Sequence, residues 1–249
     1  MSLNAIEKAL RILLAFYPRN SEMGTVDLSR KTGFHIATVN RILRILARNH
    51  FLYQNPLSRK FNLGPSVFAL GEAAIESLTD NLLPKALPYV SELCEKVRET
   101  VVLEVISGEI DTIVYVAQGK QTLGIRASIG SRMPTHAAAG AKAIIAFSSP
   151  KTIDAFLKKK MQRFTKNTIT DPRKLKLEIE KIRKEGVAFT REEMDIGVHA
   201  IGAPILNYRN QPVGAVVIVG PCSRIKCNKR SPLVSVLKET VSAISAYIR

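Results

Sequence analysis

The amino-acid sequence predicts two domains of different classes: a small N-terminal helical domain with a short β-hairpin, and a larger C-terminal α+β domain. The chain has 249 residues, which is long enough for two hydrophobic cores. Its first 65 residues contain closely spaced helical patterns followed by two short strand patterns. The remainder mixes β-branched runs with charged helical segments but lacks regular strand–helix alternation. This mixture favours an α+β domain over a doubly wound sheet.

The N-terminal segment begins with two helical patterns. Residues 4–17 place apolar side chains on one helical stripe, and Pro18 is expected to end the segment. A second helix is expected to use Thr25 as its N-cap and to run to Thr32, where Gly33 supplies a left-handed stop. The stripe of the first helix consists of Ile6, Leu10, Leu13, Leu14 and Tyr17.

A third helix is expected to start near Ile36, so that a short glycine-containing turn joins two helices as in a helix-turn-helix. Its apolar face is formed by Val39, Ile42, Leu43 and Leu46. The opposite face carries Arg41, Arg44 and Arg48, with Asn40 at its edge and Thr38 near the N-terminal end. Arginine can bind guanine or phosphate in a bidentate manner and asparagine can read adenine, so this face suits a DNA major groove.

The charge distribution supports a nucleic-acid partner. The chain has a formal net charge of +16, and residues 1–65 contain ten Lys and Arg but only three Asp and Glu. Between Asp27 and Glu72 there is no acidic residue, while seven basic residues occur. The alternative is a solvated basic surface that serves solubility. An acid-free window of this size over periodic structure favours DNA binding.

Two short strand patterns, residues 51–54 and 59–63, follow the third helix. The connection at 55–58 has the composition of a turn, and Gly64-Pro65 ends the pair. A hairpin at this place is the wing of a winged helix-turn-helix domain, which we assign to residues 1–65. Arg59 and Lys60 lie next to its tip, where they are expected to contact backbone phosphates.

The C-terminal segment contains several strand patterns and one strongly charged helix. Residues 100–106 and 112–117 are β-branched runs around a Ser107-Gly108 turn, and 212–219 is another such run. Residues 173–185 form a helix with oppositely charged or apolar pairs four residues apart. There is no glycine-rich nucleotide-binding motif.

No pattern in the sequence predicts an enzyme, a cofactor or a metal site. No Ser or Cys occupies a recognisable nucleophile motif, and the carboxylates Glu192, Glu193 and Asp195 lack the His or Cys spacing of a metal site. Lys158–Lys160 is expected to be a solvated face that could add non-specific DNA attraction. The three cysteines form no even set that would suggest disulfides. No signal peptide or membrane-spanning stretch is apparent, which predicts a cytoplasmic protein.

The sequence resembles the IclR-type transcriptional regulators over nearly its whole length. The similar segments occur in the family's order: ALRILLAF, DLSRKTGFHIATVNRILRIL, KFNLGPSVFALGEAAI, ETVVLEV, VYVAQG, SRMPTHAAAGAKAIIAF, TITDP, LEIEKIRKEGVAFTREEMDIGVHAIGAPI and VGAVVIVGP. The resemblance implies a linker helix at about Ser66–Asn81, within a linker of residues 66–82. It also implies an effector-binding domain at 83–249 built on an antiparallel sheet, and self-association as a dimer or tetramer.

The resemblance also implies where a small-molecule effector binds. The expected residues are Met133, Thr135, His136, Ala137, Ala141, Thr190, Val198, Ala200, Val217 and Val219. A loop that enters a helix at 137–141 would offer free backbone N–H groups and the positive end of a helix dipole to a carboxylate. His136 is otherwise more typical of a structural loop residue than of a catalytic one.

This chain departs from the family pattern within the expected effector site. The family often has Cys at the position of Ala200 and Ser at those of Val217 and Val219. It usually has Ser or Thr at Ala138 and Gly at Ala141. These differences favour an effector more apolar than glyoxylate, such as an aromatic or longer-chain acid. The alternative is a pocket that has lost its ligand.

We therefore expect a sequence-specific DNA-binding regulator that binds double-stranded operator DNA and is controlled by a small organic acid. Two other classes remain as alternatives. A small hydrolase would need a nucleophile and a base, and an architectural DNA-binding protein would bind no metabolite and show little sequence preference.

Overall fold

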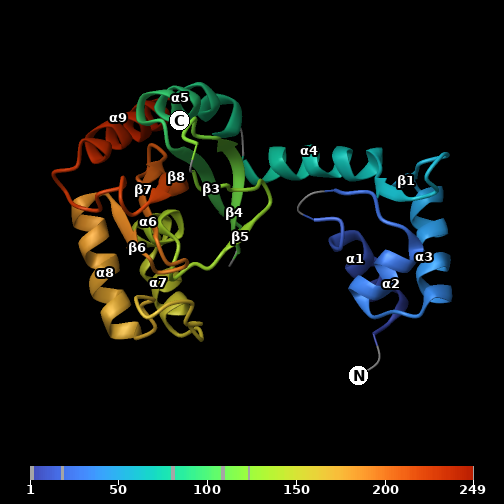
Figure 1. Ribbon diagram of the computed structural model, residues 1–249. Coiled ribbons are helices and arrows are strands. Elements are labelled where there is room, and N and C mark those ends of the chain that lie inside the picture. The colour runs from blue at the N-terminus through green and yellow to red at the C-terminus, as the bar shows by residue number, and fades with distance from the viewer. Residues whose placement is uncertain (1–2, 18–19, 80–81, 108–109, 123, 249) are drawn as a thin grey trace. The chain divides into compact units, whose positions relative to one another are not determined.

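The computed structural model describes residues 3–17, 20–79, 82–107, 110–122 and 124–248 (Figure 1). The chain divides into two compact units, Met1–Ser77 and Leu78–Arg249. Pro18, Gly108 and Asn81, at which the sequence predicts a helix end, a turn and the end of a linker helix, lie outside the described residues. No helix in the described ranges is long and apolar enough to span a bilayer.

The first unit contains three helices, a two-stranded hairpin and a long terminal helix. These are α1 (Ala5–Leu14), α2 (Thr25–Thr32), α3 (Ile36–Arg48), β1 (Leu52–Gln54), β2 (Phe61–Leu63) and α4 (Pro65–Thr79) (Figure 1). Helices α2 and α3 are joined through Gly33, whose positive φ of 75° ends α2. The helix-turn-helix and the following hairpin are confirmed.

The start of α2 differs by one residue from the prediction. Gly24 is the N-cap and Thr25 is the first helical residue. The side chain of Asp27 accepts the backbone N–H of Gly24 at 2.9 Å, so an acidic residue in the first turn closes the helix end without a hydroxyl cap. Side-chain capping at the third helical position therefore replaces the expected Thr25 cap.

Helix α1 buries a different face from the apolar stripe seen in the sequence. Ile12, Ala15 and Phe16 pack into the core of the first unit. Of the predicted stripe, Leu13 is half-buried. The other four residues are exposed: Ile6, Leu10, Leu14 and Tyr17. The helix is apolar around much of its circumference, so periodicity alone does not identify the face that the core covers.

The second unit combines a six-stranded antiparallel sheet with five helices in the described part of the chain. The helices are α5 (Leu82–Val97), α6 (Ala139–Phe147), α7 (Pro150–Leu157), α8 (Pro172–Glu185) and α9 (Pro232–Tyr247). The strands are β3 (Thr100–Ser107), β4 (Ile110–Ala117), β5 (Arg132–Met133), β6 (Ala188–Arg191), β7 (Val198–Leu206) and β8 (Pro212–Pro221). This arrangement confirms the predicted α+β class.

The strands are arranged in the order β5-β4-β3-β8-β7-β6, and every neighbouring pair is antiparallel. Strands β3, β4 and β8 coincide with three β-branched runs of the sequence, and α8 coincides with the charged helix. Because β8 pairs with both β3 and β7, the C-terminal half of the unit completes a sheet that begins with the β3–β4 hairpin.

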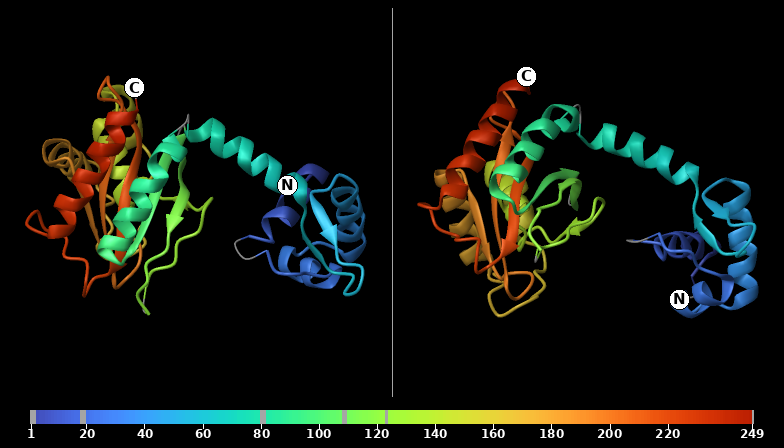
Figure 2. Two further views of the ribbon diagram at one scale, coloured as in Figure 1. Left: turned by 90° about the horizontal axis from the view of Figure 1, so that it is seen from above. Right: turned by 45° about the horizontal axis from the view of Figure 1, so that its top comes forward.

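Helices cover the two faces of the sheet with two different apolar clusters. Helices α5 and α9 lie side by side and pack on the face that carries Leu103, Ile201 and Ile218 (Figures 1 and 2). Helix α6 covers the other face, and α8 packs against α6 from outside. Successive side chains of each strand point alternately to one covered face and to the other. A polar side chain that points toward α6 is therefore buried as deeply as an apolar one.

Helix α6 lies unusually close to the sheet because glycine occupies two positions of the contact. A Cβ on Gly202 of β7 would lie 2.7 Å from the carbonyl carbon of Ala139 and 2.9 Å from the backbone nitrogen of Gly140. A Cβ on Gly140 would lie 2.8 Å from Cγ2 of Val217. Any side chain at these positions would force the backbones apart, so the two glycines fix the height of the α6 N-terminus above the sheet.

We expect Gly202→Ala to destabilise the second unit, since its Cβ meets backbone atoms that cannot rotate away. Overpacking of this kind costs about 1–3 kcal/mol. Thermal unfolding followed by circular dichroism measures the effect. Gly124→Ala is the matched control, because its Cβ would have no neighbour nearer than 3.6 Å. Equal melting temperatures for the two variants would contradict the close approach.

Candidate functional site

Helix α3 presents a basic surface on the face that is turned away from the core. Val39, Ile42, Leu43 and Leu46 are buried, as predicted. Arg41, Arg44 and Arg48 are exposed, whereas Thr38 and Asn40 are half-buried at the edge of the same face. Ile45 lies among the arginines and is also exposed. The surface therefore offers three guanidinium groups around one apolar side chain.

The hairpin places Arg59 and Lys60 in its loop. Strand β2 begins at Phe61, two residues later than predicted, because Arg59 adopts a left-handed φ of 58° that ends the strand pairing. Asn55 organises the loop: its backbone N–H donates to the Lys60 carbonyl at 2.8 Å, and its side-chain oxygen accepts from the backbone of Leu57. Arg59 and Lys60 are both exposed.

An acidic residue that the sequence analysis did not single out holds this loop. The carboxylate of Glu22 accepts hydrogen bonds from Asn55 Nδ2 at 2.7 Å and from Ser58 Oγ at 3.0 Å. The next residue, Met23, forms a β-bridge with Phe61. The segment before α2 thus acts as a third short strand that braces the hairpin. A single bridging residue leaves no alternating pattern, so sequence reasoning could not find it.

A small cavity of about 100 Å³ lies between the N-terminus of α6 and the sheet of the second unit. Its walls are mainly small and β-branched apolar residues. Six of the ten residues expected from the resemblance line it: Ala137, Thr190, Val198, Ala200, Val217 and Val219. Residues that sequence reasoning did not include also line it, among them Val102, Glu104, Ile113 and Glu193.

The other four expected residues lie outside the cavity wall. Met133 packs against the apolar cluster beside the cavity, and Thr135 lines a separate cavity of about 310 Å³. His136 forms a 2.8 Å hydrogen bond through Nε2 with the Gln162 carbonyl and stacks on Phe164, so it organises the loop. Ala141 is fully buried inside the helix.

The α6 N-terminus is less open to an anion than the sequence suggested. The backbone N–H groups of Ala137 and Ala138 both donate to the Pro134 carbonyl, at 3.0 and 2.9 Å. The N–H of Ala141 donates to the carboxyl group of Glu104. Within the first turn, the N–H groups of Ala139 and Gly140 are left without a partner from their own helix, as the geometry of a helix start requires.

Glu104 and Asp111 form a buried carboxyl pair beside the cavity. Glu104 of β3 is paired in register with Ile113, and Asp111 of β4 with Ile106, so the two acids are diagonal neighbours on the α6 face. Glu104 is 2% exposed and Asp111 is fully buried. Glu104 Oε2 and both Asp111 oxygens have no hydrogen-bond donor among the described residues unless one acid carries a proton.

Burial raises the pKa of both acids. Removal from water is the main cause for Glu104, whose pKa is well above the ordinary value, and the charge of Asp111 adds to the shift. Burial likewise raises the pKa of Asp111 to about 7. Two carboxylates have no hydrogen to share, so the pair is stable when it holds one proton between them.

Lys142 and Glu193 form a second buried polar pair on the same face. Lys142 Nζ contacts the two carboxylate oxygens of Glu193 at 2.8 and 3.0 Å and donates to the Phe189 carbonyl at 3.1 Å. Burial raises the pKa of Glu193, and the Lys142 ammonium opposes part of that shift. The lysine charge is therefore matched within the protein, and a bound anion would have to compete for it.

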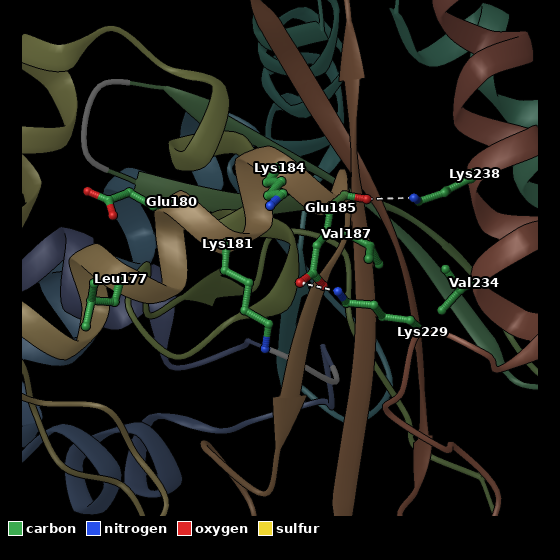
Figure 3. Close-up of a pocket in the computed structure, with 9 residues that line it drawn as sticks. All are labelled: Leu177, Glu180, Lys181, Lys184, Glu185, Val187, Lys229, Val234 and Lys238. Carbon is green, nitrogen blue, oxygen red and sulfur yellow. Dashed lines mark hydrogen bonds and ion pairs between the residues drawn. The ribbon is translucent and has the colours of Figure 1, made fainter.

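A larger groove of about 700 Å³ lies elsewhere on the second unit, at the C-terminal end of α8 (Figure 3). Four lysines line it, and two of them contact Glu185. Lys229 pairs with its carboxylate at 2.8 Å, and Lys238 donates to its carbonyl at 2.6 Å. Half of its lysines thus serve internal contacts. No group of three or more potential metal ligands occurs within the described residues.

The comparisons with known proteins point to one family for both parts of the chain. The family model described as "IclR helix-turn-helix domain" matches residues 5–56, and "Bacterial transcriptional regulator IclR C-terminal" matches residues 75–246. The DNA-binding transcriptional repressor YiaJ of Escherichia coli (strain K12) is 30% identical over 239 residues, covering 94% of this chain and 83% of the relative.

Solved structures show the same fold. The crystal structure of the Thermotoga maritima IclR superposes with a TM-score of 0.83 at 26% identity, covering 99% of each chain. An IclR homologue from Microbacterium hydrocarbonoxydans, complexed with 4-hydroxybenzoate, has a TM-score of 0.80 at 20% identity and covers 98% of each chain. At 20% identity, the similarity to the Microbacterium hydrocarbonoxydans structure shows a shared fold and nothing further.

The raised pKa of Asp111 predicts that wild-type stability decreases as the pH rises. The folded state holds the proton more tightly than the unfolded state, so this contribution is complete below about pH 4 and lost above about pH 7. Between these values the loss is on the order of 1 kcal/mol per pH unit for one proton. Asp111→Asn cannot ionise and should retain more of its stability at pH 8 than wild type.

Thermal unfolding at pH 5, 6, 7 and 8 measures this difference. Asp154→Asn removes an exposed carboxylate from α7 and should follow the wild-type pH dependence. If Asp111→Asn also follows it, the carboxyl pair does not hold an extra proton.

Proposed function

The chain belongs to the IclR family of bacterial transcriptional regulators, with a DNA-binding helix-turn-helix unit and a C-terminal effector domain. From this premise we propose that it is a sequence-specific regulator whose affinity for operator DNA is controlled by a small organic acid bound in the cavity under α6. The proposal assigns residues 1–65 to DNA binding, 66–82 to the linker and 83–249 to the effector domain.

The exposed face of α3 is the observation that carries the DNA-binding part. Its buried face is fully used by the core, so the helix presents the opposite face to a partner. Arg41, Arg44 and Arg48 form no ion pair in the described part of the chain. Three unmatched guanidinium groups with Asn40 and Thr38 beside them suit base edges and phosphates in the major groove. Arg59 and Lys60 suit the adjacent backbone.

An exposed apolar stripe on α1 supports self-association of the DNA-binding unit. Ile6 is 73% exposed and Leu14 is 69% exposed, and Leu10 and Tyr17 lie on the same stripe. A row of large apolar side chains along one helix face is costly in water and is typical of an interface. A dimer formed there would place two α3 helices to read two half-sites.

The cavity under α6 supports control by a small molecule rather than a purely architectural role. It is concave, lined mainly by apolar groups, and contains a few converging polar groups, as binding sites for small molecules do. The walls formed by Ala200, Val217 and Val219 provide no side-chain hydroxyl. They favour an acid with an apolar body over a small hydrophilic acid such as glyoxylate. The alternative to this proposal is a DNA-binding protein whose cavity binds no effector.

The test starts with an operator selected from random or genomic fragments by the purified full-length chain. Gel-shift titrations of that operator in the presence of aromatic and short hydrophilic acids then measure effector control. We expect an aromatic acid to change operator affinity at a lower concentration than glyoxylate does. If the protein binds its operator but no acid alters the affinity, the proposed DNA binding is supported and the proposed control by an effector is contradicted.

Replacing either Arg41 or Arg44 with Ala should weaken operator binding without unfolding the first unit. Loss of one good base contact costs roughly 1–3 kcal/mol, which is about a fivefold to more than a hundredfold loss of affinity. The measurement is a gel-shift titration, with circular dichroism as the folding control. Lys8→Ala, which removes a half-buried charge from α1, serves as a charge control. Wild-type affinity in both arginine variants would show that α3 does not enter the groove.

The wing, which is the β1–β2 hairpin and its loop, should strengthen DNA binding through its positive charge and not by contacting specific bases. Arg59→Ala and Lys60→Ala should lower the affinity for operator and random DNA by similar factors. Each should also reduce the slope of log affinity against log salt by about one, since one phosphate contact is lost. Fluorescence anisotropy at four salt concentrations measures both quantities. A loss confined to operator DNA would indicate that the wing reads bases instead.

A further inference from the structure

Glu104 is one of the few polar side chains that line the otherwise apolar cavity under α6. It is 2% exposed and lines the cavity, and its Oε2 has no hydrogen-bond donor in the described part of the protein. A buried, unpartnered oxygen costs free energy comparable to a lost hydrogen bond. Such an oxygen at a cavity wall indicates a group that is completed by a ligand.

The fold holds this carboxyl group in place from three directions. Gly140 makes room for it, because a Cβ there would lie 2.0 Å from Oε2. The backbone N–H of Ala141 donates to it, and Asp111 is its diagonal neighbour across the β3–β4 pair, where one proton can join the two acids. Glu104 therefore occupies the place at the start of α6 at which the sequence predicted that a ligand carboxylate would bind.

Among the described residues that line the cavity, there is no cation to receive a ligand carboxylate. On α6, Lys142 is bound to Glu193. Asp111 approaches from β4, while Glu193 and Asp195 follow β6. In the loop before α6, His136 is held by the Gln162 carbonyl. An anionic ligand in this site would thus be near acidic side chains on both walls. A protein side chain interacts favourably with such an anion only if it is a cation or a carboxylic acid that keeps its proton.

We propose that Glu104, kept as the neutral carboxylic acid by Asp111, is the hydrogen-bond donor that receives the carboxylate of the effector in this cavity. The inference rests on the proposed function and names the group that selects an acid there. The N–H groups of Ala139 and Gly140, which have no partner within their own helix, supply further donors at the same end. Asp111 is a positioning residue, because it acts through Glu104.

The proton count follows from this arrangement. Above about pH 7, where Asp111 is ionised, the empty pair holds one proton and one negative charge. Arrival of a carboxylate brings a second negative charge, and uptake of one proton returns the buried site to a single negative charge. The O–H of Glu104 then donates to the ligand while Asp111 holds the other proton. Binding is accompanied by uptake of about one proton, so affinity falls up to about tenfold per pH unit above neutral pH.

Calorimetric titration of the full-length chain with benzoate, benzamide and benzylamine tests the ligand class. The three probes share one aromatic ring and present an anion, a neutral amide and a cation. We expect benzoate to bind most tightly and its affinity to fall between pH 6 and 8. The apparent binding enthalpy should differ between phosphate and Tris buffers by the amount that uptake of one proton requires.

Variants of the carboxyl pair identify the donor. Glu104→Gln keeps an N–H donor of the same size, so benzoate affinity should stay within about fivefold of wild type. Glu104→Val removes the donor and should cost at least tenfold. Asp111→Asn should alter the pH profile more than the affinity at pH 6. Asp154→Asn is the control for a remote carboxylate, and circular dichroism confirms that each variant is folded.

Three outcomes would overturn the proposal: tighter binding of benzylamine than of benzoate, unchanged benzoate binding in folded Glu104→Val, or no benzoate binding to the wild type at millimolar concentration. The proposed function is tested separately by operator affinity. Benzoate binding that depends on Glu104 but leaves operator affinity unchanged would refute effector control of DNA and keep the role of Glu104. Operator binding without any benzoate binding would refute the role of Glu104 and leave the DNA-binding part of the proposed function in place.

Discussion

The close approach of helix α6 to the sheet is the constraint on which the second unit depends. Gly202 and Gly140 allow backbone atoms of the helix and of β7 to meet at a distance that no side chain would permit. The helix therefore starts directly above the middle strands instead of being separated from them by a layer of side chains. Every residue on that face of the sheet has to fit the remaining space, which explains the alanines and valines around the helix start.

This approach also explains why polar groups are buried there. A helix start brings N–H groups that lack an intrahelical partner, and at this height above the sheet they cannot all reach water. Pro134, in the loop before the helix, accepts two of these N–H groups, and Glu104 accepts another. The second oxygen of Glu104, Oε2, has no donor among the described residues, and Asp111 lies beside it as a diagonal neighbour across the β3–β4 pair. The carboxyl pair is thus the consequence of burying a helix end, and the same burial places it at the wall of a cavity.

The DNA-binding unit follows a simpler rule. One face of α3 is buried in the core of this unit, so core packing does not constrain the residues of the opposite face, which can bind a partner. The wing needs more support, since β1 and β2 contain only three residues each and a hairpin of that length is marginal alone. Glu22 and Met23 supply that support from a segment some 30 residues earlier in the chain. The basic loop is therefore held by side chains that carry no DNA-binding chemistry themselves.

The sequence by itself determined the local elements and the surface chemistry of α3. The period of 3.6 residues separates Val39 and Leu43 from Arg41 and Arg44, and Gly33 marks the end of α2, because these signals depend only on neighbours in the chain. The strands β3, β4 and β8 were likewise readable from β-branched runs. Tertiary structure decided which face of α1 is buried, since that helix is apolar on several sides. It also decided that Glu104 and Asp111 become partners under α6: their pairing depends on strand register and on how closely a helix approaches a sheet, and neither is encoded in a local pattern.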